Sequence, residues 1–240
     1  MIEKISGIVL DVTRHSDRHN VVTLFTRSRG RISFLSGAGG GRAGRLRNSR
    51  LQLLSVIETD INFRQNAELQ KLGAFSLSYI WSGIYFHPVK SMITLFISDF
   101  LNRLLRASMS DPALYDYIVN SLRLFDGMEQ GAFDFHIAFL ASLLPFMGIQ
   151  PDSSDWHPGS YFDMRNGTFT DHRPPHVDFL QGDEARVAAQ MSDIDFANIS
   201  ALSLDHASRR TLLDTLMRYY SIHYPGISSL PSLDILRQLK

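Results

Sequence analysis

The first 80 residues alternate short apolar runs with polar turns, a pattern that is typical of β-strands. β-Branched and apolar residues predict strands over 5–14, 21–26, 32–36 and 51–63, and more weakly over 69–77. Five short strands with a long connection after the third predict a small closed β-barrel of the OB type. A split SH3-like barrel has the same periodicity and is the structural alternative.

From about Tyr79 the apolar residues recur at helical spacing instead. Asp111 followed by Pro112 is a typical helix start, with an N-cap side chain and a proline in the first turn. The stretch 150–178 is irregular and proline-rich, with a small hairpin predicted around Asn166-Gly167. The predicted helices span 89–106, 113–125, 132–147, 182–191, 205–221 and 229–239.

The two periodicities predict an α+β fold, with a five-stranded OB-fold β-barrel over 1–80 followed by an α-helical domain over 81–240. The irregular insert at about 150–178 belongs to the second domain. A length of 240 residues with 44% hydrophobic residues is sufficient for a substantial core.

The amino-acid composition excludes several kinds of functional site. The chain has no cysteine, which excludes disulfides, thiol nucleophiles and Cys-ligated metals. No apolar run approaches the length of a membrane span, and the N-terminus lacks the features of a signal peptide. We therefore expect a cytoplasmic protein without a membrane partner.

The net charge of zero hides a strong asymmetry. Residues 1–50 contain ten basic and three acidic side chains, a formal charge of +7, and the remaining residues carry −7. Within the first 50, the stretch 27–50 has no acidic residue, and we call it the basic segment. A localised positive charge of this size is typical of contacts with a polyanion. The seven arginines of the basic segment are Arg27, Arg29, Arg31, Arg42, Arg45, Arg47 and Arg50.

The glycine run Gly37–Gly41 within the basic segment predicts a flexible loop. It lacks the GxxxxGK[ST] pattern of a phosphate-binding loop, so a mobile arginine arm is the better interpretation. Guanidinium groups spaced along such an arm each meet one phosphate, which predicts salt-dependent DNA binding. An ordinary surface loop is the alternative. Phe25 and Phe34 are the aromatic residues of the barrel, and we expect both in the core rather than as stacking platforms.

We find no motif for covalent catalysis and predict that the protein is not an enzyme and has no cofactor. His157, His172 and His176 lie among several aspartates in the irregular insert, but Pro174-Pro175 prevents a helical pair of ligands. Turn-forming polar roles are the better interpretation. The apolar helical domain allows a groove for a partner peptide, and the candidate residues at its edge are Arg103, Arg106 and Arg123. Ordinary pairing on the helix surface is the alternative for these arginines.

The N-terminal sequence GIVLDVTRHSDRHNVVTLFTRSRGRISFLSGAG resembles the start of the RecO family of bacterial recombination mediators. Near the C-terminus, Tyr219-Tyr220, His223 and the segment SLDIL resemble the last helices of that family. The resemblance runs over the whole chain in order and length. The resemblance is specific in the N-terminal part, whereas the middle helices resemble the family only in their general helical pattern and share no motif with it.

The resemblance implies an OB-fold joined to an α-helical domain, with binding of single- and double-stranded DNA and annealing of complementary strands. It also implies that the protein acts with RecR to promote loading of RecA onto DNA coated with single-strand-binding protein, at the nucleoid. The acidic, apolar C-terminal tail of single-strand-binding protein is a further implied partner, bound by the helical domain. The basic segment corresponds to the DNA-binding surface of the family.

Many family members carry two CxxC pairs after the central helix. Here the first pair would fall at Asp155 and Pro158, and the second within Asp171–His176, so the chain resembles the zinc-free branch of the family. A non-catalytic adaptor whose basic segment binds an acidic protein is the alternative function. An adaptor would keep its partner at saturating oligonucleotide and would not anneal strands.

Overall fold

The computed structural model describes residues 2–37, 41–198 and 205–237. The centre of the predicted glycine loop, residues 38–40, therefore lies outside the described residues. The chain forms two compact units, Met1–Met128 (unit 1) and Glu129–Lys240 (unit 2). Unit 1 thus combines the strand-rich part with the first two long helices, whereas the sequence places the domain boundary near residue 80.

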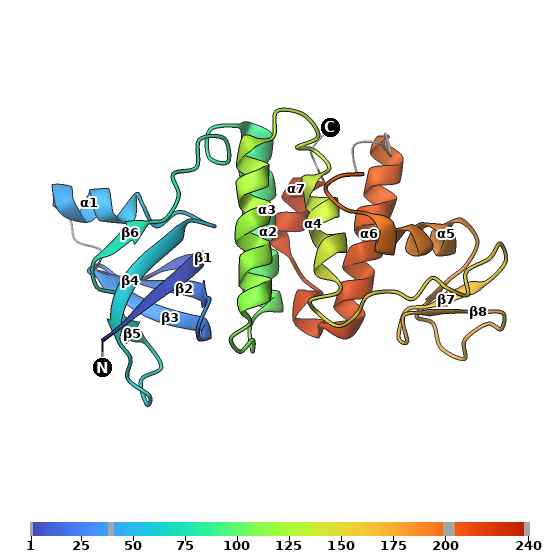
Figure 1. The fold of residues 1–240 in the computed structure, drawn as a ribbon, viewed down its shortest axis with the longest axis horizontal. Coiled ribbons are helices and arrows are strands. Elements are labelled where there is room, and N and C mark those ends of the chain that lie inside the picture. Colours follow the sequence, from blue (N-terminus) through green and yellow to red (C-terminus); the bar gives the residue numbers. More distant parts are fainter. Residues whose placement is uncertain (1, 38–40, 199–204, 238–240) are drawn as a thin grey trace. The chain divides into compact units, whose positions relative to one another are not determined.

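Unit 1 begins with a six-stranded sheet in the order β5-β3-β2-β1-β4-β6 (Figure 1). The long first strand is shared, because its first half pairs with β4 and its second half with β2. This strand sharing bends the sheet around one core, and together with the helices that follow it confirms the predicted fold class. The strands are β1 (Ile2–Ser16), β2 (His19–Thr26), β3 (Gly30–Gly37), β4 (Val56–Asn62), β5 (Gln70–Lys71) and β6 (Phe75–Leu77).

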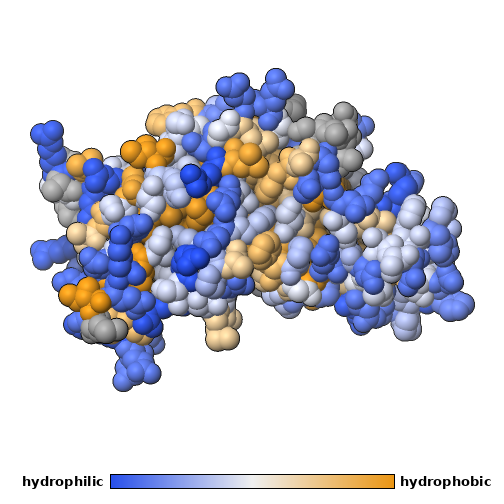
Figure 2. Space-filling model, in the orientation of Figure 1, coloured by the Kyte–Doolittle hydropathy of each residue, from blue (hydrophilic) through white to orange (hydrophobic). Residues whose placement is uncertain are grey.

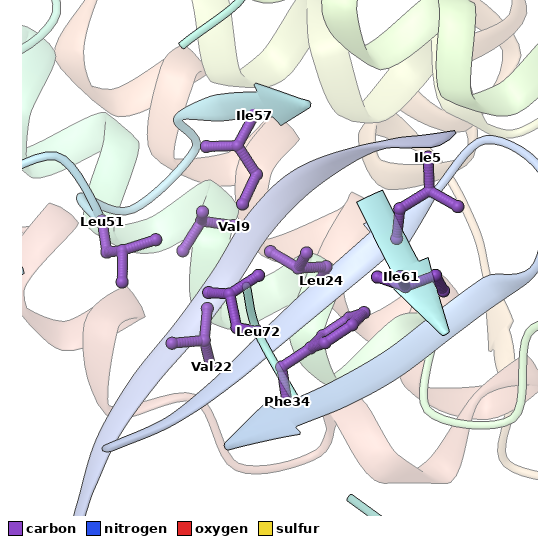
Figure 3. Packing of buried hydrophobic residues seen from close by; sticks show 9 residues of the cluster. All are labelled: Ile5, Val9, Val22, Leu24, Phe34, Leu51, Ile57, Ile61 and Leu72. Carbon is purple, nitrogen blue, oxygen red and sulfur yellow. The ribbon is translucent and has the colours of Figure 1, made fainter. Parts of the chain in front are cut away.

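The core of the sheet is aliphatic, with one phenylalanine at its centre. Figure 3 shows these side chains converging from several strands, and Leu51 and Leu72 join them from outside the strands. Phe25 and Phe34 are both fully buried, so the expectation that they belong to the core is confirmed. The cluster consists of Ile5, Val9, Val22, Leu24, Phe34, Leu51, Ile57, Ile61 and Leu72.

Two predicted strands are shorter than expected. The stretch 51–55 is not a strand, and Leu54 adopts a positive φ of 61° where the chain turns into β4. The predicted strand over 69–77 is divided into β5, which pairs in parallel with β3, and β6, which pairs with β4. The segment 42–48, expected as part of a flexible loop, forms the short helix α1 (Arg42–Asn48).

Helices α2 (Pro88–Leu104) and α3 (Pro112–Gly127) complete unit 1. Asp111 caps α3 by accepting a hydrogen bond from the amide of Leu114 at 2.9 Å, with Pro112 in the first turn, as the sequence predicts. The hydroxyl of Ser98 in α2 donates to the carbonyl of Leu10 in β1 at 2.7 Å, and both residues are buried. This contact ties the helix directly to the sheet.

The linker from the sheet to α2 is held by the end of α3. Asp126 accepts hydrogen bonds from the amides of Ser82, Gly83 and Ile84 and from the hydroxyl of Ser82, at 2.7–3.1 Å. Burial acts against the charged form, but these hydrogen bonds outweigh it and lower the pKa of Asp126. Lys90 at the start of α2 donates to the carbonyl of Asp126 at 2.8 Å, which shows that α2 and α3 are antiparallel.

Unit 2 is built around α4, which is buried on all sides as its apolar sequence predicts. The hydroxyl of Tyr220 in α6 donates to the carbonyl of Leu140 in α4 at 2.8 Å. The predicted hairpin around Asn166-Gly167 is confirmed as β7 and β8, with Gly167 at a φ of +69°. The elements are α4 (Phe135–Leu143), β7 (Tyr161–Asp163), β8 (Thr168–Thr170), β9 (Phe179–Leu180), α5 (Asp183–Gln190), α6 (His206–His223) and α7 (Pro231–Leu236).

Candidate nucleic-acid interface

The tight turn between β2 and β3 presents the first two arginines of the basic segment, and a carboxylate holds each of them. Arg27 forms a bidentate pair with Asp116 of α3, through Nε at 2.9 Å and Nη2 at 2.8 Å. Arg29 donates from Nε and Nη2 to one oxygen of Glu3 at 2.8 and 2.6 Å. The hydrogen bonds from the arginines lower the pKa of both carboxyl groups. Both guanidinium groups are therefore neutralised locally.

The backbone of this turn is fixed independently of the ion pairs. Gly30 has a φ of +69°, and a Cβ at this position would lie 2.4 Å from the carbonyl oxygen of Ser108. The amide of Arg31 donates to the same carbonyl at 3.3 Å, and its Nη2 donates to Oδ1 of Asn102 at 3.0 Å. Burial, with a smaller effect of the Arg106 charge, lowers the pKa of Arg31. Arg31 is therefore half-buried against the helical part of unit 1 rather than presented to solvent.

Helix α1 divides the remaining arginines. Arg47 donates from Nη2 to the carbonyls of Leu72 and Gly73 at 2.8 and 2.9 Å, which fastens the helix to the connection between β5 and β6. Arg42 and Arg50 are exposed, and within the described ranges their side chains have no hydrogen bond or ion pair. The side chain of Arg45 lies outside what the structure describes.

The seven arginines that the sequence groups together are therefore not equivalent. Arg42 and Arg50 are presented to solvent, Arg27 and Arg29 are exposed but paired, and Arg31 and Arg47 are used to hold the fold. The expectation of one uniformly mobile arm is wrong for the segment 42–48, because α1 is helical and anchored by Arg47.

The structure adds cations that the sequence did not group with the basic segment. His19 pairs with Gly37 across β2 and β3, which places the tip of the β1–β2 hairpin beside the end of β3. This tip carries the exposed Arg18. Lys71 pairs with Leu35 and is exposed at the outer edge of the sheet. The position of Arg18 could be predicted, because it lies in the polar turn between the first two predicted strands. The position of Lys71 could not, because it depends on the parallel pairing of β5 with β3, which no local pattern indicates.

The three arginines predicted to border a partner groove are not brought together. Arg103 near the end of α2 pairs with Asp99 at 2.9 Å, and Arg106 follows shortly after the helix. Arg123 lies in the last turns of α3, with its guanidinium 4.7 Å above the ring of Tyr79. Because α2 and α3 are antiparallel, Arg123 is at the opposite end of the helix pair, and the three side chains do not converge on one groove.

Unit 2 instead contains an apolar depression with a basic border. Its apolar residues are Phe133 before α4, Leu213 of α6 and Leu236 of α7. Arg210 and Arg237 stand at its border, and both face Asp214, at 3.8 and 2.6 Å respectively. His136, His206 and Arg209 complete the lining. The depression combines apolar surface with guanidinium groups, which suits an acidic and apolar peptide.

Two of the three histidines of the irregular insert contact carboxylates. Nε2 of His157 lies 2.6 Å from Oδ1 of Asp171, and Nε2 of His176 lies 3.3 Å from Oδ1 of Asp163. These pairs join the two parts of the insert. Among the described residues no group of three His, Asp or Glu side chains has the arrangement of a metal site. His172 is not part of either pair.

Figure 2 shows that the strand-rich part presents a largely hydrophilic surface on the face toward the viewer, interrupted by small apolar patches. No helix in the described part of the chain is both long and apolar enough to span a membrane. A bent sheet with exposed arginines on the neighbouring helix α1 and after it, followed along the chain by a helical unit with a basic-bordered depression, presents surfaces that suit negatively charged ligands.

Comparison with known proteins identifies the family. Residues 1–80 match the family model described as Recombination protein O N terminal, and residues 86–234 match Recombination protein O C terminal. The chain is 32% identical over 240 residues to a protein from Bacteroides fragilis named DNA repair protein RecO, with 100% of this chain and 99% of the relative covered. Proteins of the same name from Phocaeicola vulgatus (30%; 100% and 99% covered) and Porphyromonas gingivalis (32%; 97% of each covered) are similarly related. The chain belongs to the RecO family of DNA repair proteins.

Proposed function

We propose that this protein is a non-catalytic recombination mediator that binds single- and double-stranded DNA and anneals complementary strands. In this proposal it acts with RecR to promote the loading of RecA onto DNA coated with single-strand-binding protein, in the cytoplasm at the nucleoid. Membership of the RecO family supports the repair role. The observation that carries DNA binding is the pair of exposed arginines, Arg42 and Arg50, that have no carboxylate partner among the described residues.

Guanidinium groups without a counter-charge bind phosphates and release condensed counterions, which makes affinity fall with salt. The β1–β2 hairpin tip and the edge strand β5 add Arg18 and Lys71 to the same end of the sheet. We therefore place the main DNA contacts on α1, its flanks and this end of the sheet, and assign a smaller share to the paired arginines of the β2–β3 turn.

Fluorescence anisotropy with a labelled single-stranded oligonucleotide tests this proposal. We expect the double variant Arg42→Ala and Arg50→Ala to bind more weakly and to reduce the slope of log affinity against log salt by about 1.4, because each contact with single-stranded DNA contributes about 0.7. Arg186→Ala in unit 2, which removes an exposed arginine elsewhere, is the control. Absence of DNA binding by the wild type at low salt would refute the proposal.

We further propose that the apolar depression of unit 2 receives the acidic, apolar C-terminal tail of single-strand-binding protein. Phe133, which is 39% exposed, supplies accessible apolar surface, and the almost buried Leu213 and Leu236 lie in the lining. Arg210 and Arg237 supply guanidinium groups at the border, where both contact Asp214. Charge-assisted hydrogen bonds from arginine to carboxylates are strong and directional, which suits a peptide that ends in acidic groups.

Titration of a labelled tail peptide tests this placement. We expect Arg210→Ala to weaken peptide binding by about tenfold or more, since removal of a hydrogen bond to a charged group costs about 1.5–3 kcal/mol. Arg103→Ala, which alters a guanidinium in unit 1, is the matched control and leaves binding unchanged. The reverse pattern would place the tail on α2, at the arginines that the sequence suggested.

The adaptor alternative makes a different prediction. If the basic segment binds an acidic protein rather than DNA, the complex with that protein persists at saturating oligonucleotide and no strand annealing occurs. An annealing assay on oligonucleotides coated with single-strand-binding protein, with and without its C-terminal tail, separates the two functions. Exposed arginines next to an OB-type sheet, with no carboxylate partner among the described residues, favour the mediator.

A further inference from the structure

The two arginines of the β2–β3 turn are exposed yet already engaged. Arg27 uses Nε and Nη2 for Asp116, and Arg29 uses the same two nitrogens for Glu3. These nitrogens form one of the edges through which arginine makes bidentate contacts with phosphate. The ring of Phe63, 4.3 Å from the guanidinium of Arg29, also covers one face of that group. At both positions a carboxylate of the chain therefore occupies the edge of the guanidinium group that a phosphate would contact.

We propose that Asp116 and Glu3 act as latches that limit DNA affinity by occupying Arg27 and Arg29. The inference rests on the proposed DNA binding and adds two residues that set its strength. A guanidinium paired at 2.8 Å with a carboxylate is almost neutral at a distance, so it adds little to the attraction that draws DNA to the surface. A phosphate that approaches either arginine also meets the negative charge of its carboxylate.

The Asp116 latch is weak enough to open. The side chains of Arg27 and Asp116 are about half exposed, at 52% and 48%. Ion pairs with this exposure contribute little to stability, and salt screens them. A DNA phosphate that makes the same bidentate contact can therefore displace the carboxylate. In the wild-type complex the phosphate and the carboxylate therefore compete for the arginine, while free protein keeps it neutralised.

The turn itself does not depend on the ion pairs, which makes the latches separable from the fold. Gly30 packs against the backbone at Ser108, and the amide of Arg31 bonds to the same carbonyl. The hydroxyl of Ser110 donates to the carbonyl of Arg27 at 3.1 Å. These contacts hold the backbone of the turn in place when a carboxylate is removed, so the freed guanidinium stays on the surface.

The two carboxylates that pair with Arg27 and Arg29 belong to residues outside the basic segment. Glu3 lies at the start of β1 and Asp116 in the first turns of α3, and both are brought to the β2–β3 turn by the fold alone. The basic segment contains no acidic residue, but in the folded protein the carboxylates of Glu3 and Asp116 neutralise part of its positive charge. The balance falls on the turn, whereas Arg42 and Arg50 have no carboxylate partner in the part of the chain that the structure describes.

The test is a double-mutant cycle in DNA binding with Asp116→Asn, Arg27→Ala and the combination, measured by anisotropy with a single-stranded oligonucleotide from 50 mM to 1 M salt. One additional phosphate contact steepens the salt slope by about 0.7, which corresponds to roughly eightfold tighter binding at 50 mM if the contact contributes nothing at 1 M. We expect a gain up to this limit in Asp116→Asn alone, because a DNA phosphate displaces Asp116 in only part of the wild-type complexes. In the Arg27→Ala background the substitution of Asp116 has a much smaller effect, because no guanidinium is released.

Glu3→Gln provides an independent second variant, expected to tighten binding through Arg29 in the same way. Glu184→Gln in unit 2 removes the same charge away from the turn and controls for net charge. Circular dichroism verifies that each variant is folded. Wild-type affinity and slope in both Asp116→Asn and Glu3→Gln would overturn the latches, and so would an equal gain in Glu184→Gln or in the Arg27→Ala background. If the wild type binds no DNA at all, the proposed function itself fails, which is a distinct result.

Discussion

His136, at the second position of α4, is fully buried, and its environment disfavours a positive charge. Burial is the main cause, the nearby charge of Arg209 adds to it, and together they lower the pKa of His136 to about 3. In the unfolded chain the same imidazole titrates near its ordinary value of about 6.5. As the pH falls below 6.5, the imidazole therefore binds a proton in the unfolded state but not in the folded state. The free energy of unfolding decreases as a result.

The size of the effect follows from these two pKa values. Between pH 7.5 and pH 5, the linkage costs about 2 kcal/mol of unfolding free energy for His136 alone. We expect the variant His136→Gln, which has no titrating group, to lack this component. Its stability at neutral pH will be lower because the packing around α4 changes, so the relevant quantity is the difference in pH dependence between the two proteins.

The measurement requires a signal from unit 2 alone. Trp81 belongs to unit 1 and Trp156 to unit 2, so fluorine-labelled tryptophan gives one resonance for each unit during urea unfolding. We expect the midpoint reported by Trp156 to fall between pH 7.5 and 5 in the wild type and to fall less in His136→Gln. An identical pH dependence in the two proteins would show that His136 is protonated in the folded state, and the burial argument would be wrong.

Three further outcomes follow from single contacts. Gly30→Ala should destabilise unit 1 by about 2 kcal/mol or more in urea unfolding, because a Cβ would meet the carbonyl of Ser108 and the positive φ is unfavourable for alanine. Asp126→Ala should cost about 3 kcal/mol by the same measurement, because three amides and a hydroxyl of the linker lose their acceptor. Asp171 raises the pKa of His157, so this ion pair stabilises the fold below the unfolded pKa and loses its effect as pH rises through the folded pKa. Histidine NMR titration should show a lower pKa for His157 in Asp171→Asn, and an unchanged value would refute the pairing.

Local patterns predicted the parts of the fold that are determined locally. Asp111 and Pro112 placed the start of α3 correctly, since the cap and the proline act within one turn. The uniformly apolar α4 was identified as buried for a similar reason. The division of the predicted fifth strand was missed, because β5 and β6 pair with different strands and Lys71 faces a partner distant in sequence.

The candidate interface shows the same limit. Charge counting located the basic segment, because seven arginines without an acidic neighbour are visible in the sequence. It could not separate Arg47, whose acceptors are carbonyls that follow β5, from the exposed Arg42. Nor could it find the partners of Arg27 and Arg29, since Asp116 is 89 residues and Glu3 is 26 residues away from them along the chain. Ion pairs between distant segments are set by the tertiary fold, which local patterns do not encode.

The hydrogen bonds from the linker to Asp126 affect where two family members can be joined to make a chimeric protein. The two family models meet between residues 80 and 86, and this is the natural place to join halves of two proteins. Any junction in this range takes β1 from one parent and α2 from the other, so the contact of Ser98 with β1 is divided between the parents. A junction after residue 84 also separates Asp126 from the linker amides that it binds. A junction at 128/129 transfers the sheet together with α2 and α3 and leaves every one of these contacts within a single parent.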